Sequence, residues 1–372
     1  MLYWLFFIIL LYFSFKEIYT NKIDRKAFQW MWIALLLMAV LRQGQGTDYY
    51  NYEDIYKEVE NITTEPSVLL YHIMSDPGYR ILNFIAIHLG IPYIVFASLF
   101  SLLIFYIIYP FFNKQCNKSM IALFMFYASS FFIPYLLNQW RQALVVAIFL
   151  RIYPLLSEGK YKQFNLWIIL SSTIHLSALV LLAAPIIQKI RFGRNLILIV
   201  CFISILFLFV NPFELILFKI GLTRINYYIG DDSTGAKYLA WMVRIILIIP
   251  LFLIPESIYK RNKEFRIIRN FIIAGFIIFC CFSFSELIAS RLNIYFRVLE
   301  WYFAVLIIHK TKLKIISRQL CYCYLMLITV LFAKDIQGSI SQGEYENCNI
   351  LTYPYLSVFD DKETIEFYRK DI

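Results

Sequence analysis

Charged residues are scarce in this sequence. Only 16% of its 372 residues are charged, whereas 60% are hydrophobic, and the mean hydropathy is +0.65. A chain of this composition has too few charges to cover a water-soluble globule, which excludes an ordinary soluble protein. The seven cysteines show neither a disulfide framework nor zinc-ligand spacing. Internal repeats and low-complexity tracts are also absent. The sequence therefore predicts a single polytopic membrane domain over residues 1–372.

Apolar runs that approach the ~20 residues needed for a transmembrane helix recur along the chain. The first run has no basic segment before it and no small-residue cleavage site after it, so we interpret it as a retained helix with its N-terminus outside. We predict an all-α integral membrane protein with about ten full transmembrane helices, at approximately 2–15, 28–41, 92–112, 120–137, 143–156, 196–210, 238–254, 270–287, 292–308 and 320–333.

The apolar stretch at 164–187 is long enough for one tilted span and too short for two. The segments that flank it, 157–163 and 188–195, are both basic. A single crossing would also place the strongly basic segment 257–269 outside, against the positive-inside rule. We therefore predict a re-entrant helical pair with a turn near 173–177. Irregular backbone at membrane depth is tolerated where it lines a cavity, so this turn is expected at a site.

The predicted topology divides the net charge of +10 into two unlike parts. The cytoplasmic loops contain 20 basic and four acidic residues, whereas the outer segments contain 12 basic and 19 acidic residues. The overall basicity thus follows from membrane orientation and gives no reason to expect nucleic acid as a partner. The long outer connections are 42–91, 211–237 and a C-terminal tail at 334–372. An interfacial helix is expected at 79–89, within the first of them.

A few ionisable residues run against these trends. Arg141 and Arg291 lie at the outer ends of spans, and His175 lies at the predicted turn. Arg42 and Asp48 enclose a short segment with two glycines at the start of the first outer loop. Ionisable residues at membrane depth usually face a cavity or a partner. Arg151, Arg244, Arg297 and Glu300 lie within spans. Pairing inside the bundle stays open as an alternative for Arg151 and Arg297, and snorkelling to the membrane surface for Arg244.

Several arginines on an outer face suit a ligand with phosphate groups, because guanidinium makes bidentate, charge-assisted contacts. The tyrosine and tryptophan rings and scattered polar groups of the chain also suit sugars. A glycan joined through a diphosphate to a membrane lipid would use both kinds of residue.

Six short motifs follow one another along the chain: Arg42-Gln43-Gly44-Gln45-Gly46-Thr47-Asp48-Tyr49 with Tyr52 after it, Asp76-Pro77-Gly78-Tyr79, Arg141-Gln142-Ala143-Leu144, His175-Leu176-Ser177-Ala178-Leu179, the run from Arg291 to Tyr295, and Tyr353-Pro354-Tyr355. Their order and spacing resemble those of the EpsG/Wzy-type polysaccharide polymerases over nearly the whole chain. Each motif is weak alone, and the ordered set is more specific.

The resemblance implies a polymerase that joins undecaprenyl-diphosphate-linked oligosaccharide repeat units into O-antigen, capsular polysaccharide or exopolysaccharide. It implies a glycosyltransferase of the bacterial cytoplasmic membrane, multi-pass, with both termini on the outer side. No metal or other cofactor is implied. The implied partners are the lipid-linked oligosaccharide, the lipid bilayer and, as a candidate, a chain-length regulator. Two alternatives stay open, a lipid-linked oligosaccharide flippase and an O-antigen ligase, although the chain has no half-to-half repeat typical of a transporter.

Glycosyl transfer needs charge stabilisation at the departing diphosphate and a base for the incoming hydroxyl. Arg141 and Arg291 are the first candidates for the diphosphate. The base is expected to be His175 or Asp48: histidine has the better unperturbed pKa, whereas Asp48 would need burial to raise its own. The remaining candidates for binding the diphosphate or the glycan are Arg42, Arg297, Gln142, Tyr49 and Tyr295.

Overall fold

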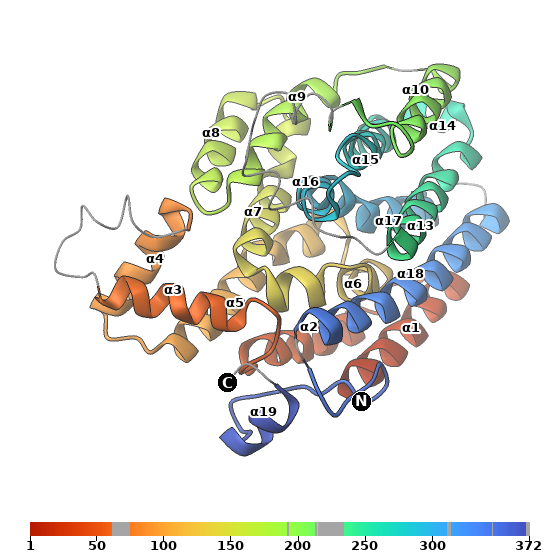
Figure 1. The fold of residues 1–372 in the computed structure, drawn as a ribbon. Coiled ribbons are helices and arrows are strands. Elements are labelled where there is room, and N and C mark those ends of the chain that lie inside the picture. The colour runs from red at the N-terminus through yellow and green to blue at the C-terminus, as the bar shows by residue number, and fades with distance from the viewer. Residues whose placement is uncertain are drawn as a thin grey trace.

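The computed structural model describes residues 1–61, 75–191, 193–212, 214, 234–310, 314–343 and 345–369. Within these ranges the regular structure is helical, and β-type pairing is limited to two isolated bridges, Arg42 with Ser357 and Tyr345 with Arg369. The predicted all-α class is therefore confirmed. The N-terminus and the C-terminal helix α19 (Lys362–Tyr368) lie on the same side of the bundle (Figure 1).

The first half of the chain alternates long helices with short or irregular ones. In chain order its elements are α1 (Leu2–Thr20), α2 (Arg25–Val40), α3 (Tyr49–Asn61), α4 (Pro77–His88), α5 (Tyr93–Pro110), η2 (Phe111–Gln115), α6 (Met120–Ala128), η3 (Phe132–Asn138), α7 (Trp140–Ser157), α8 (Tyr161–Ser172), η4 (Leu176–Ala183) and α9 (Ala184–Ile187).

The second half contains the longest helix that the structure describes. Its elements before α19 are α10 (Arg194–Leu206), α13 (Thr234–Leu253), α14 (Glu256–Arg261), α15 (Lys263–Cys281), α16 (Glu286–Arg297), α17 (Leu299–Lys310) and α18 (Lys314–Gln342).

Two helices form the centre of the bundle. Every residue of α6 is buried, and so are residues 299–308 of α17. A helix that is apolar on all sides must lie inside the protein or in lipid. Here α6 packs against α1, α2, α17 and α18, which accounts for its burial. Peripheral helices show the opposite pattern: α1 and α5 expose large apolar side chains such as Ile8 and Tyr106, as expected of helices that face lipid.

Fewer helices than predicted are long and apolar enough to cross a membrane. Five in the described ranges meet that criterion, or six if the bent pair α6 and η3 counts as one span. They are Leu2–Thr20, Tyr93–Gln115, Trp140–Ser157, Glu286–Lys310 and Arg318–Gln342.

Local breaks and short helices account for part of the difference from the ten expected, and several boundaries are shifted. The chain bends by 70° between α6 and η3, inside the expected span 120–137, and α10 is only 13 residues long. Residues 288–291, which separate two expected spans, lie in the first turns of α16 instead. Helix α18 continues through Gln342, nine residues into the expected tail at 334–372. Most of the expected outer loop at 211–237 lies outside the described residues.

Two finer predictions match the structure locally. The stretch 164–187 divides into α8 and the pair η4–α9, with the break at 173–175, inside the predicted turn. The helix expected at 79–89 is α4, which buries Arg80 and Asn83 against the protein and exposes Ile81 and Ile85. Its outward apolar face is the one that an interfacial helix would turn to lipid. The entry of either segment into the bilayer stays a prediction.

Candidate active site

The segment 42–48 turns tightly between α2 and α3. Gly44 and Gly46 have φ values of +63° and +104°, which glycine adopts without strain. A Cβ on Gly46 would lie 2.6 Å from the carbonyl oxygen of Leu137, so the backbone approaches η3 more closely than any other residue would allow. Two residues later, the backbone N–H of Asp48 donates to Asn138 Oδ1 at 2.6 Å. Asp48 is thereby fixed where η3 ends and α7 begins.

Arg141, in the first turn of α7, meets residues from both helices of the first loop. Its Nη1 forms an ion pair with Asp76 Oδ2 at 3.3 Å, and the two side chains are 21% and 24% exposed. Its Cζ lies 5.3 Å from the ring centroids of both Tyr52 and Tyr79, on α3 and α4, a geometry that favours cation–π attraction. The first and second motifs therefore converge on the third.

The break between α8 and η4 joins the same cluster through the start of α4. The backbone N–H of Gly78 donates to the carbonyl of Thr173 at 2.7 Å. A Cβ on Gly78 would lie 2.8 Å from that oxygen, so this contact also requires glycine. The backbone N–H of Leu176 donates to the Asp76 carboxylate. Asp76 therefore connects α7 with the turn that carries His175.

A polar network connects this turn with α16. The amide of Gln142 donates to Ser177 Oγ at 3.3 Å and to the backbone carbonyl of Arg291. Ser177 Oγ lies 2.8 Å from the hydroxyl of Tyr295 and 3.4 Å from His175 Nδ1. Four motifs, on α4, α7, α16 and the segment His175–Leu179, thus meet at one place, and Asp48 of a fifth motif interacts there with Arg141 and Arg291. We call the residues gathered there (Asp48, Asp76, Arg141, Gln142, His175, Ser177, Arg291 and Tyr295) the outer cluster, after the side of the membrane that the sequence predicts for them, which stays a prediction.

The charges of the outer cluster act on one another. Burial raises the pKa of the Asp48 carboxyl, while the positive charges of Arg291 and Arg141 oppose the rise. Burial, and then the same two arginines, lowers the pKa of His175 to about 3. His175 lies in the turn outside the candidate spans and is neutral near pH 7. Burial thus weakens His175 and strengthens Asp48 as a proton acceptor, and the choice between them as base stays a prediction.

Three residues expected at the site make other contacts. Arg42 is 1% exposed, and its Nη1 donates to the carbonyl of Leu136 at 3.1 Å. The Nη2 of Arg297 donates to the carbonyl of Ser129 at 2.8 Å, at the break between α6 and η3. Tyr49 packs its ring on Tyr93 and accepts the hydroxyl of that residue at its carbonyl. These side chains are bound to structural groups, whereas Tyr295 and Gln142 do belong to the outer cluster.

Four residues of this region were not among the expected site residues: Asp76, Ser177, Tyr52 and Tyr79. Asp76 was included only as the first residue of the second motif, without a role of its own. Tyr52 and Tyr79 sit in the motifs themselves. Helix α3 was also not predicted. It buries Tyr49, Tyr52 and Tyr56, whose sequence spacing places them on one helix face, so this aromatic pattern is a signal that could have predicted the helix.

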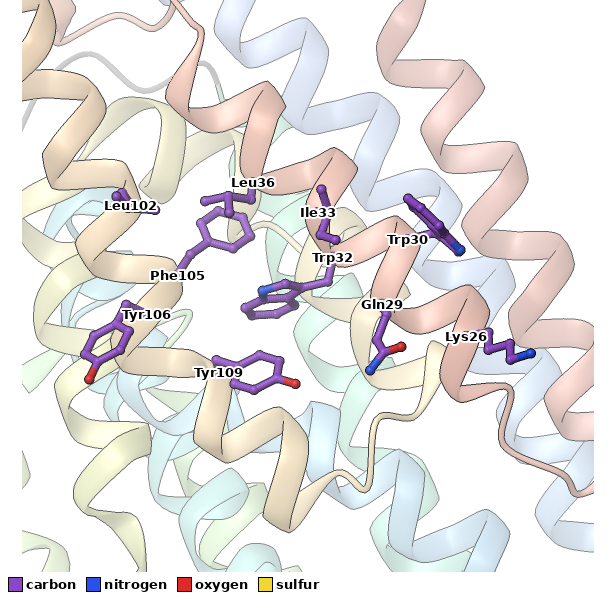
Figure 2. Close-up of a pocket in the computed structure, with 10 residues that line it drawn as sticks. All are labelled: Lys26, Gln29, Trp30, Trp32, Ile33, Leu36, Leu102, Phe105, Tyr106 and Tyr109. Atoms are coloured by element: carbon purple, nitrogen blue, oxygen red, sulfur yellow. The ribbon is translucent and has the colours of Figure 1, made fainter.

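The structure contains a second notable feature, a groove between α2 and α5 with a volume of about 790 Å³ (Figure 2). Its walls are mainly aromatic and aliphatic, with Trp32, Phe105 and Tyr109 along it and Lys26 at one end. No member of the outer cluster lines it. Across the described ranges, no three His, Cys, Asp or Glu side chains are grouped closely enough to hold a metal ion.

The comparisons with known proteins are consistent with this arrangement. No curated protein and no solved structure matches the chain. A family model, that of the EpsG family, matches residues 31–357, which include every residue of the outer cluster. This is a family of polysaccharide polymerase-like membrane proteins. Because the match covers most of the sequence, the chain belongs to the EpsG family.

Proposed function

We propose that the protein polymerises oligosaccharide repeat units carried on a polyprenyl diphosphate such as undecaprenyl diphosphate, at the outer face of the bacterial cytoplasmic membrane. The observation that carries this proposal is the convergence of two arginines with two carboxylates and a neutral histidine, from segments far apart in sequence. Family membership supports the class of reaction.

Arg141 and Arg291 have the surroundings of a diphosphate site. The ion pair of Arg141 with Asp76 is partly exposed, so an incoming phosphate can compete for the guanidinium. The Arg291 side chain is half-buried, and in the described part of the chain no carboxylate oxygen lies within ion-pair distance of it. Two arginines facing one place would bind the donor diphosphate and stabilise the charge that grows on it as the glycosidic bond breaks.

Asp48 is suited to the role of the base. In the proposed reaction, a hydroxyl of the acceptor sugar attacks the anomeric carbon of the donor glycan. The bond from that carbon to the diphosphate oxygen breaks, and the lipid diphosphate leaves with the electron pair. The hydroxyl proton passes to the Asp48 carboxylate, whose raised pKa makes it a better acceptor than an exposed aspartate. Neutral His175 would serve as a hydrogen-bond partner for a phosphate or sugar oxygen.

The test is the surface-glycan ladder of a deletion strain complemented with single variants. Arg141→Ala and Arg291→Ala should each lower the yield of long chains by about 100-fold or more, the scale on which one transition-state donor acts. Arg261→Ala is the matched control, because this exposed arginine lies on α14, outside the cluster. All variants are compared at equal membrane abundance.

The deletion strain also distinguishes the alternatives. A single repeat unit on the acceptor indicates a lost polymerase, free lipid-linked polymer a lost ligase, and absence of outer glycan a lost flippase. Long chains at normal yield from abundant Arg141→Ala and Arg291→Ala proteins would refute the role of the two arginines.

A further inference from the structure

The C-terminal segment at 345–369 lies against the segment 42–48. The backbone N–H of Gln43 donates to the carbonyl of Leu356 at 3.1 Å, and the N–H of Val358 donates to the carbonyl of Leu41 at 2.9 Å. The pairing of Arg42 with Ser357 lies between these two bonds. About 300 residues separate the partners along the chain, so this contact is made only in the folded protein.

Arg369 holds the two glycine carbonyls of the loop. Its Nη1 donates to the oxygen of Gly46 at 2.8 Å and to that of Gly44 at 3.3 Å. Its Cζ lies 5.1 Å from the ring centroid of Tyr50 and 4.7 Å from that of Tyr345, so the guanidinium is enclosed between two aromatic rings. The residue is 4% exposed. Carbonyl dipoles and ring faces thus surround a buried cation, the environment in which guanidinium is better suited than ammonium.

The residue between the two glycines is fixed by the same segment. The amide nitrogen of Gln45 donates to the hydroxyls of Tyr353 and Tyr345, at 2.7 and 3.1 Å, and its Oε1 accepts the N–H of Leu356 at 2.9 Å. The hydroxyl of Tyr345 in turn accepts the N–H of Gly46 at 3.2 Å. Both polar groups of the Gln45 side chain are therefore used to anchor the loop.

The held loop ends at Asp48. Only Thr47 separates Gly46 from Asp48, whose N–H is bound to Asn138. Gly46 itself is pressed against the carbonyl of Leu137. A loop with two residues at positive φ has many backbone conformations open to it when it is not restrained, so its geometry here depends on the groups that hold it.

We propose that Arg369 is a positioning residue for Asp48: by binding the carbonyls of Gly44 and Gly46 it holds the loop in the conformation that places the carboxylate in the outer cluster. This proposal rests on the proposed function for its consequence in glycan synthesis. Arg369 acts through the loop and makes no contact with the reacting groups. It lies beyond residue 357, where the family match ends.

The test is hydrogen–deuterium exchange of the purified full-length protein in detergent or nanodiscs. In Arg369→Gln, amides of residues 43–48 should exchange about tenfold faster, whereas those of α7 keep their protection. Arg369→Lys keeps the charge between the rings and loses the planar fork, so its effect should be intermediate. Lys362→Gln is the matched control, because this cation on α19 has a side chain that is 79% exposed and, among the described residues, forms an ion pair with Glu366 in the next turn. It should leave the exchange unchanged.

Glycan ladders of the same variants complete the test. Arg369→Gln should shorten the chains, Arg369→Lys should restore part of their length, and Lys362→Gln should match the wild type. Unchanged exchange at 43–48 in Arg369→Gln would overturn the proposal, whatever the ladder shows. If Arg369→Gln also loses the protection of α7, Arg369→Lys decides: normal exchange at 43–48 overturns the proposal, and a local increase supports it. Faster local exchange, together with normal ladders from Asp48→Asn and Arg141→Ala, would uphold the positioning contact and refute the proposed function instead.

Discussion

The arginines of the outer cluster differ from the buried arginines that bind backbone carbonyls in the partners of their guanidinium groups. Arg141, on α7, is about one-fifth exposed and pairs with the carboxylate of Asp76, at the start of α4. Arg42, Arg297 and Arg369 are at most 7% exposed, and each donates to a backbone carbonyl. The first kind can exchange its partner for a ligand, whereas the second already binds the protein backbone.

Two of the arginines that bind the backbone reach carbonyls at points where a regular helix stops. Arg297 reaches Ser129, directly after α6, and Arg42 reaches Leu136 in the irregular element η3. Breaks in a helix leave carbonyl groups without their usual partners, and in a membrane protein water does not replace them. A buried arginine satisfies such groups from a distance. An arginine on the outer side of a membrane protein therefore indicates a substrate site only if its guanidinium is not already bound to backbone.

The largest effects should separate these two kinds of arginine. Arg42→Ala removes a fully buried side chain, its bond to Leu136 and its contact with the Trp140 ring at 4.7 Å. We expect a loss of about 3 kcal/mol in the free energy of unfolding, typical of a large buried truncation. Arg141→Ala should lower the yield of long chains by about 100-fold and change stability by less than about 1 kcal/mol, as for a partly exposed ion pair.

Thermal unfolding of both variants in detergent, read beside the glycan ladder, checks this separation. Arg42→Met is the control for volume, because it fills much of the same space and should lose less stability than Arg42→Ala. An Arg42→Ala protein with normal thermal stability and lost polymer would place Arg42 with the outer cluster and contradict the distinction.

A smaller effect is expected at Gly46, where the segment 42–48 lies against η3 beside the outer cluster. Gly46→Ala combines a positive φ with a Cβ that would lie 2.6 Å from the Leu137 carbonyl, so we expect a cost of about 2 kcal/mol and shorter glycan chains. Gly90→Ala is the matched control. Gly90 also has a positive φ, +66°, but nothing lies within 4 Å of the added Cβ, so it isolates the backbone term. Equal loss of stability in both variants would show that the close approach to η3 is unimportant.

The sequence predicted the elements whose signals are local. The apolar run at 164–187, flanked by basic residues, predicted the helical pair and its turn, and the helix expected at 79–89 corresponds to α4. The ordered motifs predicted that Asp48, Arg141, His175 and Arg291 belong together, and the structure does gather them. Hydrophobic periodicity and charge bias suffice to predict such helices and turns, because each signal lies within one short stretch of sequence.

The remaining features depend on contacts between distant segments. The hydrogen bonds of Arg369 to Gly44 and Gly46 join residues more than 320 positions apart, and nothing in either local sequence marks them. The bend after α6 lies in an apolar run whose sequence predicts one span. The carbonyl of Ser129 at this bend accepts a hydrogen bond from Arg297, 168 residues later. The two kinds of arginine differ in the exposure and the hydrogen-bond partner of the guanidinium group. Both properties depend on the tertiary structure, so the sequence could not separate Arg42 and Arg297 from the arginines of the site.

The smallest expected effect concerns the pH dependence of the outer cluster. As base, Asp48 acts in its ionised form, so activity should fall as the pH drops through its raised pKa, at a higher pH than for an exposed aspartate. His175, with a pKa of about 3, stays neutral over the same range. His175→Gln should therefore lower polymer synthesis by less than about tenfold, as for the loss of one neutral hydrogen bond, and leave the pH midpoint in place. The measurement is chain synthesis by membranes supplied with lipid-linked repeat units between pH 4.5 and 8, with buffer set at about half-unit steps. A midpoint that moves in His175→Gln would make the histidine the titrating group and return the base assignment to it, because a neutral bystander cannot set the pH at which the reaction stops.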